Sequence, residues 1–356
     1  MTAWAFVVGI NAYPAESRLR PLAGAVADAA EFADWLLHAQ GGSVAREHLF
    51  LWTCPAPANP GPAVAGYMAN PTPWPMLVPD FGRPPSAMEI NLGVNLVARK
   101  AREAGADRLY VFFAGHGFQT KEVAYDEPAQ TCFVAGNFHP DMMAPGLVPC
   151  DDMARMLKAQ GPPEIVLFLD ACRSDASLRV ARPMPPWNVV PDPGHNLKLC
   201  VGRAAQEQRV AYEIPHGKPN RGAFSTLLVN GLRTHRVDGR LTLRELDNFV
   251  SEGIAPLVSP QEQWPDFDER PRPWQLVLAE GPPIGALPKL VIALPAGLPE
   301  ANVLVGGPQN QRVELGGLPG EQELPLEPGA YVVESVGGVV LASFAHVGPG
   351  DTHVQL

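Results

Sequence analysis

Two apolar, strand-like runs of the sequence end in side chains that can do chemistry. The segment VFFAGHG (111–117) places His116 between two glycines, and the segment VLFLDAC (166–172) ends at Cys172. A thiolate is a strong nucleophile, and an imidazole can protonate a leaving amine. The N–H groups of Gly117 and Cys172 are candidate donors to the oxyanion of a tetrahedral intermediate. These residues predict a Cys–His dyad; the alternative is that both are ordinary buried side chains.

Alternating strand-like and helix-like segments must position this pair. Continuous apolar runs are typical of strands buried on both faces, and apolar residues at helical spacing predict helices between them. We expect strands at 5–10, 48–52, 108–115, 164–171 and 198–205, and helices at 25–39, 88–105, 150–161, 222–233 and 242–254. This alternation predicts an α/β fold with a mostly parallel sheet and helices on both faces. Ligands bind at the carboxyl ends of such strands, where the dyad would meet.

Changes in composition divide the chain. Residues 54–85 contain ten prolines, which predicts a surface insertion with no regular element. The stretch 176–196 is also rich in proline and directly follows the nucleophile segment. After residue 281, short β-prone runs separated by Gly and Pro predict a small all-β sandwich or barrel over 282–356. We therefore expect an α/β domain at 1–281 and a β-rich interaction or packing domain behind it.

Composition and charge exclude several classes of protein. The chain has 356 residues, of which 46% are hydrophobic and 18% charged, as in globular proteins. A net charge of −10 argues against nucleic acid as a partner. We expect no membrane span and no signal peptide. The five cysteines are odd in number and none are two apart, which argues against a disulfide framework or a zinc ribbon and favours the cytoplasm.

Four segments resemble the caspase-like cysteine peptidases, especially the bacterial members and the metacaspases. They are YVFFAGHG, VLFLDACRS, GAFSTLL and the N-terminal WAFVVGINAYP with its following LRPLAGAVADAAEFADWL. The resemblance covers roughly residues 3–250 in the family's order. It implies a caspase-like fold, with His116 and Cys172 as the catalytic dyad. It also implies cleavage of protein or peptide substrates after a charged P1 residue, the residue whose carbonyl is attacked.

The resemblance also bears on the P1 preference. Asp170 stands where metacaspases, which cut after Arg or Lys, carry Asp. Asp28 matches their second acid in the S1 pocket, the pocket for the P1 side chain. Glu213 stands near the position of a caspase S1 arginine. Paired carboxylates suit a guanidinium, which donates bidentate bonds. The alternatives are a helix-start acid for Asp28 and a solvated surface charge for Glu213.

Further expectations concern activation and cofactors. In the family the segment after the nucleophile separates a large from a small part, so 176–196 is the expected site of processing. Arg179 and Arg182 are the candidate self-cleavage sites; Pro183 makes Arg182 the poorer one. An upstream activating protease is another expected partner. Too few acids follow Cys172 to supply the six to eight oxygens of a calcium site, so we expect no metal and no cofactor.

Two other classes of function remain open. One is a catalytically silent scaffold on the same fold, acting through the β-rich domain; the presence of both dyad residues argues against it. The other is a different hydrolase or an acyltransferase, which would not need acids in a P1 pocket. The peptidase interpretation suits a role in bacterial defence, regulated cell death or signalling.

Overall fold

The computed structural model describes most of the chain in two compact units. The described residues are 1–74, 77–120, 129–173, 198–214, 220–258, 262–270, 276–285, 289–294, 301–306, 311–316, 320–326, 329–335, 339–346 and 352–355. The first unit comprises Met1–Ser225 and Gln263–Leu276, and the second comprises Thr226–Glu262 and Val277–Leu356.

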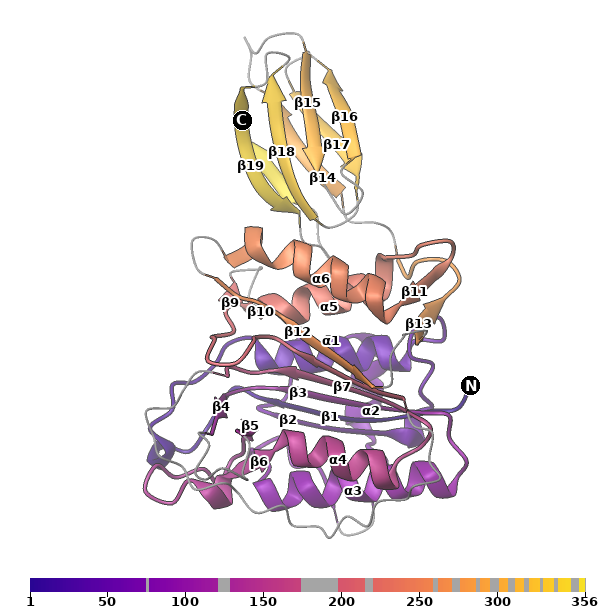
Figure 1. Ribbon diagram of the computed structural model, residues 1–356, viewed down its shortest axis with the longest axis vertical. Helices are drawn as coiled ribbons and strands as arrows, with labels where there is room; N and C mark the ends of the chain where they lie inside the picture. Colours follow the sequence, from indigo (N-terminus) through magenta and orange to yellow (C-terminus); the bar gives the residue numbers. More distant parts are fainter. Residues whose placement is uncertain are drawn as a thin grey trace. The chain divides into compact units, whose positions relative to one another are not determined.

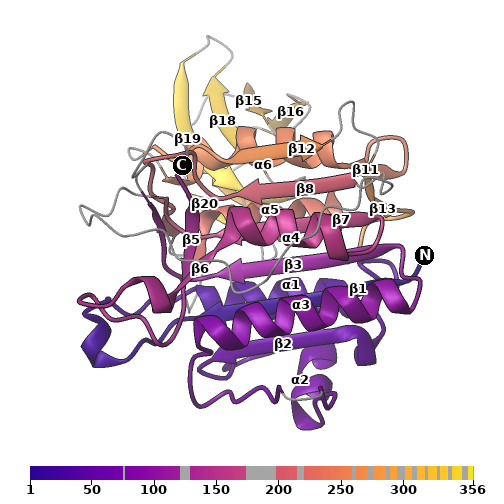
Figure 2. The ribbon, with the colours of Figure 1, turned by 60° about the horizontal axis from the view of Figure 1, so that its bottom comes forward.

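A six-stranded sheet forms the centre of the first unit. Its order is β12-β8-β7-β3-β1-β2, which Figure 2 shows as successive ribbons. The strands are β1 (Ala3–Ile10), β2 (Leu49–Cys54), β3 (Arg108–Ala114), β7 (Glu164–Asp170), β8 (Lys198–Arg203) and β12 (Asp266–Arg270). All neighbours are parallel except β12, which runs antiparallel to β8. The parallel strands therefore end at the same edge.

Helices cover both faces of this sheet (Figure 1). On one face lies α1 (Ala25–Leu37), where Phe32 stacks on Phe112 of β3 with ring centroids 4.6 Å apart. On the other lie α3 (Ala87–Glu103) and α4 (Cys150–Gln160), whose apolar side chains share one buried cluster with Phe6 and Phe113. Every residue of β1 is buried, which explains why its sequence shows no alternation of polar and apolar residues.

The proline-rich stretch differs from the prediction. It contains a regular helix, α2 (Pro62–Ala69), which begins with a proline at the first helical positions, where the missing N–H costs nothing. Tyr67 of this helix is fully buried, and its hydroxyl donates to the carbonyl oxygen of Leu49 at 3.2 Å. The prediction of no regular element was therefore wrong, because a proline prevents a helix from continuing through it but not from starting at it.

Short elements complete the first unit. A three-stranded sheet contains β4 (Gly117–Gln119), β5 (Thr131–Val134) and β6 (Leu147–Pro149), and a two-stranded ribbon pairs β9 (Glu213–Ile214) with β10 (Arg221–Gly222). Three 3₁₀ turns are η1 (Ala15–Ser17), η2 (Arg46–His48) and η3 (Ala144–Gly146). None of these elements was predicted, because strands of two to four residues carry no readable periodicity.

The second unit contains the remaining elements. Helix α5 (Ala223–Thr234) enters it from the first unit, and α6 (Leu243–Val258) packs on α5 around Gly231. Strand β11 (Arg240–Thr242) pairs with β13 (Val277–Glu280). The other strands are β14 (Lys289–Leu294), β15 (Ala301–Gly306), β16 (Gln311–Gly316), β17 (Gly320–Pro325), β18 (Gly329–Ser335), β19 (Val340–His346) and β20 (Thr352–Gln355).

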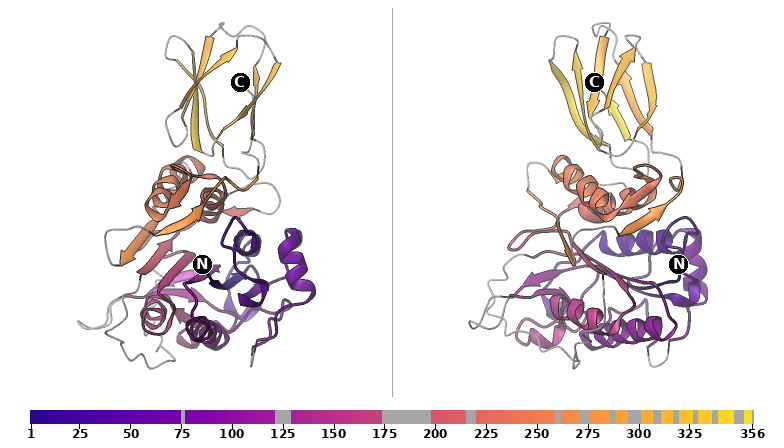
Figure 3. Two further views of the ribbon diagram at one scale, coloured as in Figure 1. Left: turned by 90° about the vertical axis from the view of Figure 1, so that its right-hand side faces the viewer. Right: turned by 45° about the vertical axis from the view of Figure 1, so that its right-hand side comes forward.

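The strands from β14 onward form two sheets, ordered β17-β14-β20 and β16-β15-β18-β19. The left view of Figure 3 shows them face to face. Ile292 of β14 and Leu304 and Tyr331 of the other sheet belong to one buried cluster. The part of the chain from β14 onward, called the tail below, is therefore a sandwich rather than a closed barrel.

The α/β fold class is confirmed, with its mostly parallel sheet, its helices on both faces and a C-terminal all-β part. Predicted helices and central strands lie within a few residues of the observed ones. The domain boundary between 281 and 282 stays a prediction, since the compact units group 226–262 with the tail. The predicted processing stretch 176–196 lies outside the described residues.

Candidate active site

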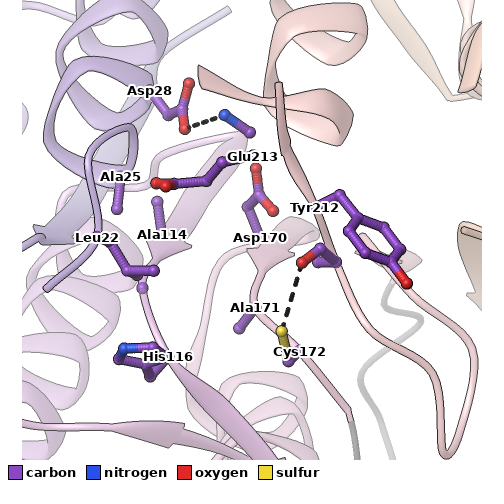
Figure 4. A pocket seen from close by; sticks show the side chains of 13 residues that line it. Leu22, Ala25, Asp28, Ala114, His116, Asp170, Ala171, Cys172, Tyr212 and Glu213 are labelled. Atoms are coloured by element: carbon purple, nitrogen blue, oxygen red, sulfur yellow. Dashed lines mark hydrogen bonds between the residues drawn. The ribbon is translucent and has the colours of Figure 1, made fainter. Parts of the chain in front are cut away.

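A pocket opens at the carboxyl ends of β3 and β7. The register of these parallel neighbours places Ala114 opposite Asp170, and the Gly115 N–H donates to the Asp170 carbonyl oxygen at 3.1 Å. The pocket has a volume of about 80 Å³. His116 and Cys172 line it together with the carboxylates of Asp28, Asp170 and Glu213, as Figure 4 shows. The fold thus brings together the two expected dyad residues and the three expected P1-pocket acids.

Hydrogen bonds to Tyr13 and Arg20 help to fix His116. Its main-chain N–H donates to the hydroxyl oxygen of Tyr13 at 3.0 Å, and the two rings lie 5.2 Å apart between centroids. Its Nε2 lies 2.7 Å from the carbonyl oxygen of Arg20. Because a carbonyl oxygen only accepts, Nε2 must carry a proton. In the neutral ring, Nδ1 is then the nitrogen that can accept a proton.

The protonation of His116 follows from its surroundings. Burial lowers the pKa of His116 below its usual value, and the hydrogen bond to Arg20 and the charge of Glu213 oppose this effect without cancelling it. The ring is therefore neutral at pH 7, and its Nδ1 is available as a base.

The thiol of Cys172 is partly buried beside acids. Its Sγ donates to the carbonyl oxygen of Ala211 at 3.5 Å. Burial raises the pKa of Cys172, and the negative charges of Asp170 and Glu213 raise it further. The substrate-free site therefore contains a thiol rather than a thiolate at neutral pH, and a base must remove its proton.

The dyad and the acids occupy different parts of the pocket. In Figure 4, His116 and Cys172 lie at one end, and Asp28, Asp170 and Glu213 gather at the other. Within the described part of the chain, no hydrogen bond joins His116 to Cys172. The pocket therefore presents a thiol and an imidazole at one end and three carboxylates at the other.

Gly117 begins β4 directly against the nucleophile segment. A Cβ at this position would lie 2.6 Å from the carbonyl oxygen of Cys172 and 2.7 Å from the Cβ of Ala171, so only glycine permits the approach. Gly117 is not among the residues that line the pocket. The oxyanion role of the Gly117 and Cys172 N–H groups stays a prediction.

Asp170 is held by the start of α5. The N–H and the hydroxyl of Ser225 donate to its Oδ2 at 3.2 and 2.5 Å. Burial raises the pKa of Asp170 to about 6, against the stabilising bonds from Ser225. A Cβ on Gly222 would collide with this oxygen and would also approach Oδ2 of Asp28. Glycine therefore allows both carboxylates to lie against the main chain at this position.

Asp28 already has a cationic partner inside the protein. Its Oδ1 accepts from Nε of Arg221 at 2.5 Å, and its Oδ2 accepts from the Gly222 N–H at 2.9 Å. Arg221 also donates to Glu31. Burial opposes the guanidinium charge, but these two carboxylates raise the pKa of Arg221, which stays protonated. Asp28 is therefore part of a buried ion pair and is not only an acid at the start of a helix.

Glu213 differs from the other two acids in being exposed. Its Oε1 accepts hydrogen bonds from the N–H groups of Ala23 and Gly24, which directly precede α1. The side chain is thus anchored across the pocket rather than freely solvated.

The residue after the nucleophile fastens its segment to the fold. Arg173 is 4% exposed and donates to Gln119 of β4, to Glu207 and to Asp266 of β12, each at 3.2 Å. Asp266 also accepts from Arg203 at 3.3 Å. This ion-pair network fixes the main chain on which Cys172 lies.

Four residues that shape the site were missed by sequence reasoning: Tyr13, Arg20, Arg221 and Ser225. Tyr13 follows the end of β1, so the strand-end rule that identified the dyad could have found it. Arg20 acts through its main chain, and Arg221 and Ser225 act through partners distant in sequence, which no local pattern reports.

Some predicted residues are not placed. Arg179 and Arg182 lie outside the described residues, as do Asp175 and Asp192, the acids after Cys172 that were considered for calcium. Within the described part, no group of three or more His, Cys, Asp or Glu side chains could hold a metal ion. The helices in that part include none that is long and apolar enough to span a membrane.

Comparisons with known proteins bear on the fold and on the family of the chain. The crystal structure of protein GSU0716 from Geobacter sulfurreducens is similar, with a TM-score of 0.50 and 15% sequence identity over 80% of this chain and 100% of that one. At this identity the likeness concerns the fold alone. No curated protein matches the chain. The family model described as "Caspase domain" matches residues 2–274. The chain therefore belongs to the Peptidase_C14 caspase family.

Proposed function

We propose that this protein is a cysteine endopeptidase that cuts protein substrates after a basic P1 residue, Arg or Lys. The observation that carries the proposal is a single pocket with His116 and Cys172 at one end and three carboxylates at the other. Membership of the caspase family supports peptidase activity. A scaffold role would require neither this dyad nor the acids beside it.

The proposed reaction uses the protonation states described above. The P1 carbonyl enters between the dyad residues, and Nδ1 of His116 takes the thiol proton as Sγ of Cys172 attacks the carbonyl carbon. The N–H groups of Gly117 and Cys172 donate to the resulting oxyanion. His116 then protonates the leaving amine as the peptide bond breaks, which leaves the acyl group bound to Cys172 as a thioester. A water molecule activated by His116 hydrolyses this thioester.

The acids would bind the P1 side chain. Asp170 accepts from Ser225 through Oδ2, which leaves Oδ1 for a guanidinium or ammonium group. Glu213 supplies a second carboxylate from β9. Asp28 contributes negative charge but shares it with Arg221. A charge-assisted bidentate contact of this kind favours Arg, and an ammonium group makes Lys the second choice.

Fluorogenic peptides that differ only at P1 test the proposal. The wild type should cleave Arg and Lys peptides and leave Asp and Leu peptides intact. Cys172→Ala and His116→Ala should each lose activity by a factor on the order of 10³ or more while keeping the wild-type circular dichroism spectrum. A preference for Asp at P1 would disprove the pocket assignment, and near-normal activity in either variant would disprove the dyad.

Self-processing belongs to the same proposal. If Arg is the preferred P1 residue, Arg179 is the better self-cleavage site, because Pro183 follows Arg182 and removes the N–H after that bond. Mass spectrometry of wild type and Cys172→Ala, incubated side by side, should show fragments only from the wild type. A wild-type chain that stays intact while it cleaves Arg peptides would rule out self-processing as a condition of activity.

A further inference from the structure

Glu213 caps a helix that belongs to a distant part of the chain. Its Oε1 accepts from the N–H groups of Ala23 at 2.9 Å and Gly24 at 2.6 Å. Gly24 is the N-cap residue of α1 and has no side chain with which to cap it. The carboxylate of Glu213 therefore satisfies main-chain donors at the positive end of a 13-residue helix.

The segment that Glu213 holds also carries the hydrogen-bond partner of His116. Arg20 precedes Ala23 by three residues, and its carbonyl oxygen lies 2.7 Å from Nε2 of the imidazole. Leu22, between them, lines the pocket. Residues 20–24 therefore connect the carboxylate of Glu213 to the carbonyl group that orients the ring.

A second residue holds the same segment from the side of β1. The carbonyl oxygen of Asn11 accepts from the Leu22 N–H at 2.9 Å, and its side-chain amide donates to the carbonyl oxygen of Ala23 at 3.1 Å. Its Oδ1 accepts from the Val26 N–H at 3.0 Å. Loss of the Glu213 carboxylate would thus leave the Ala23 and Gly24 N–H groups without this acceptor, while Asn11 still holds the segment from the side of β1.

We propose that Glu213 is a positioning residue for His116, which it orients by holding residues 20–24 in place through its bonds to Ala23 and Gly24. The inference rests on the proposed peptidase function and gives one of its P1-pocket acids a second task. The length of the side chain serves the positioning. Its charge serves the basic P1 residue and also raises the pKa values of His116 and Cys172. Substitutions that change only the length or only the charge separate the two tasks.

Two conservative variants separate them. Glu213→Gln keeps the length and a carbonyl oxygen that can accept from both N–H groups, but it removes the charge. Glu213→Asp keeps the charge, but its carboxylate is one methylene too short to reach them. Glu47→Gln, at an exposed carboxylate of η2, is the matched control for loss of surface charge. Thermal unfolding shows whether each variant is folded.

Steady-state kinetics on an Arg peptide should split the two tasks. Glu213→Gln should raise KM and leave kcat within about threefold of wild type. Glu213→Asp should lower kcat by about ten- to a hundredfold, because displacing a catalytic group by about 1 Å can cost on the order of 10²-fold. Equal kcat values for the two variants, or a kcat loss confined to Gln, would overturn the proposal.

A spectroscopic measurement makes the test independent of peptidase activity. Nitrogen NMR of ¹⁵N-histidine-labelled protein, with His116 assigned by its absence in His116→Gln, reports which ring nitrogen carries the proton. Wild type and Glu213→Gln should show a single form protonated at Nε2. Glu213→Asp should show a mixture of both tautomers. An unchanged NMR signal in Glu213→Asp would overturn the positioning role, whether or not the protein cleaves peptides. If the NMR result is as expected but the wild type cleaves no peptide, only the peptidase proposal is refuted.

Discussion

Asp28 and Arg221 form a buried ion pair across 193 positions of sequence, with Nε of the guanidinium 2.5 Å from Oδ1 of the carboxylate. The two side chains are 2% and 5% exposed. The pair fastens β10, and with it Gly222 in the wall of the pocket, to the first turn of α1. An acid expected to recognise the substrate is thus also part of the architecture of the pocket.

Removal of one partner should therefore destabilise the fold. Asp28→Ala should lower the free energy of unfolding by about 3–5 kcal/mol, because it leaves a buried guanidinium with Glu31 as its remaining carboxylate. Urea unfolding followed by tryptophan fluorescence measures the loss. The double variant Asp28→Ala/Arg221→Met should recover part of it. If the double variant lost as much free energy of unfolding as the two single variants together, the two side chains would not stabilise each other, which would contradict the prediction.

Asp170 should make the affinity for a basic P1 residue depend on pH. Because burial raises the pKa of Asp170 to about 6, its carboxyl loses its charge as the pH falls through that value. If the contact between Asp170 and the P1 side chain requires the charged carboxylate, KM for an Arg peptide should rise by roughly tenfold for each pH unit below the pKa. Asp170→Asn should give a high KM without the step near pH 6. Burial also raises the pKa of Asp28 to about 7 in spite of Arg221, so a step that remains near pH 7 in the variant belongs to Asp28. An unchanged step near pH 6 would contradict the assignment to Asp170.

Asp170→Ala also tests the division of the pocket into two ends. Cleavage of Arg peptides should be lost, since the P1 cation loses its buried partner, while Cys172 should still react with iodoacetamide. Loss of both would show that Asp170 supports the nucleophile rather than the P1 side chain. Glu47→Gln again serves as the control for charge alone.

The thiol of the substrate-free protein should be slow to react at neutral pH. Burial and the neighbouring acids raise the pKa of Cys172, so thiolate forms only above the usual range of about 8.5. Alkylation by iodoacetamide, corrected with Cys172→Ala for the other cysteines, should increase steeply above that pH. Rapid alkylation with a plateau near pH 6 would instead indicate a preformed thiolate–imidazolium pair.

A truncated chain tests the predicted domain boundary. A protein that ends at residue 281 should remain folded and cleave Arg peptides if 282–356 is a separate domain. Circular dichroism and peptide cleavage measure both properties. Since the structure groups 226–262 with the tail in one compact unit, an insoluble or inactive truncated chain would show that α5 and α6 need the tail for their stability.

The sequence by itself determined the five parallel strands of the sheet, the helices α1, α3 and α4 that cover it, and the strand ends that carry the dyad residues, but not the antiparallel strand β12. Residues 109–114 of β3 and 165–169 of β7 form continuous apolar runs because both faces of these strands are buried, so each strand is recognisable from its own residues alone. Parallel strands end at one edge, so His116 and Cys172 had to lie near each other. Asp170 was found by the same argument.

The tertiary structure alone decided what each acid of the pocket contacts. Glu213 binds the Ala23 and Gly24 N–H groups, Asp28 pairs with Arg221, and Asp170 accepts from Ser225. Periodicity and strand ends are local properties of the chain, whereas these bonds join segments far apart in sequence. Their geometry depends on how closely α1, β9 and β10 pack, and a single glycine at 222 makes that packing possible.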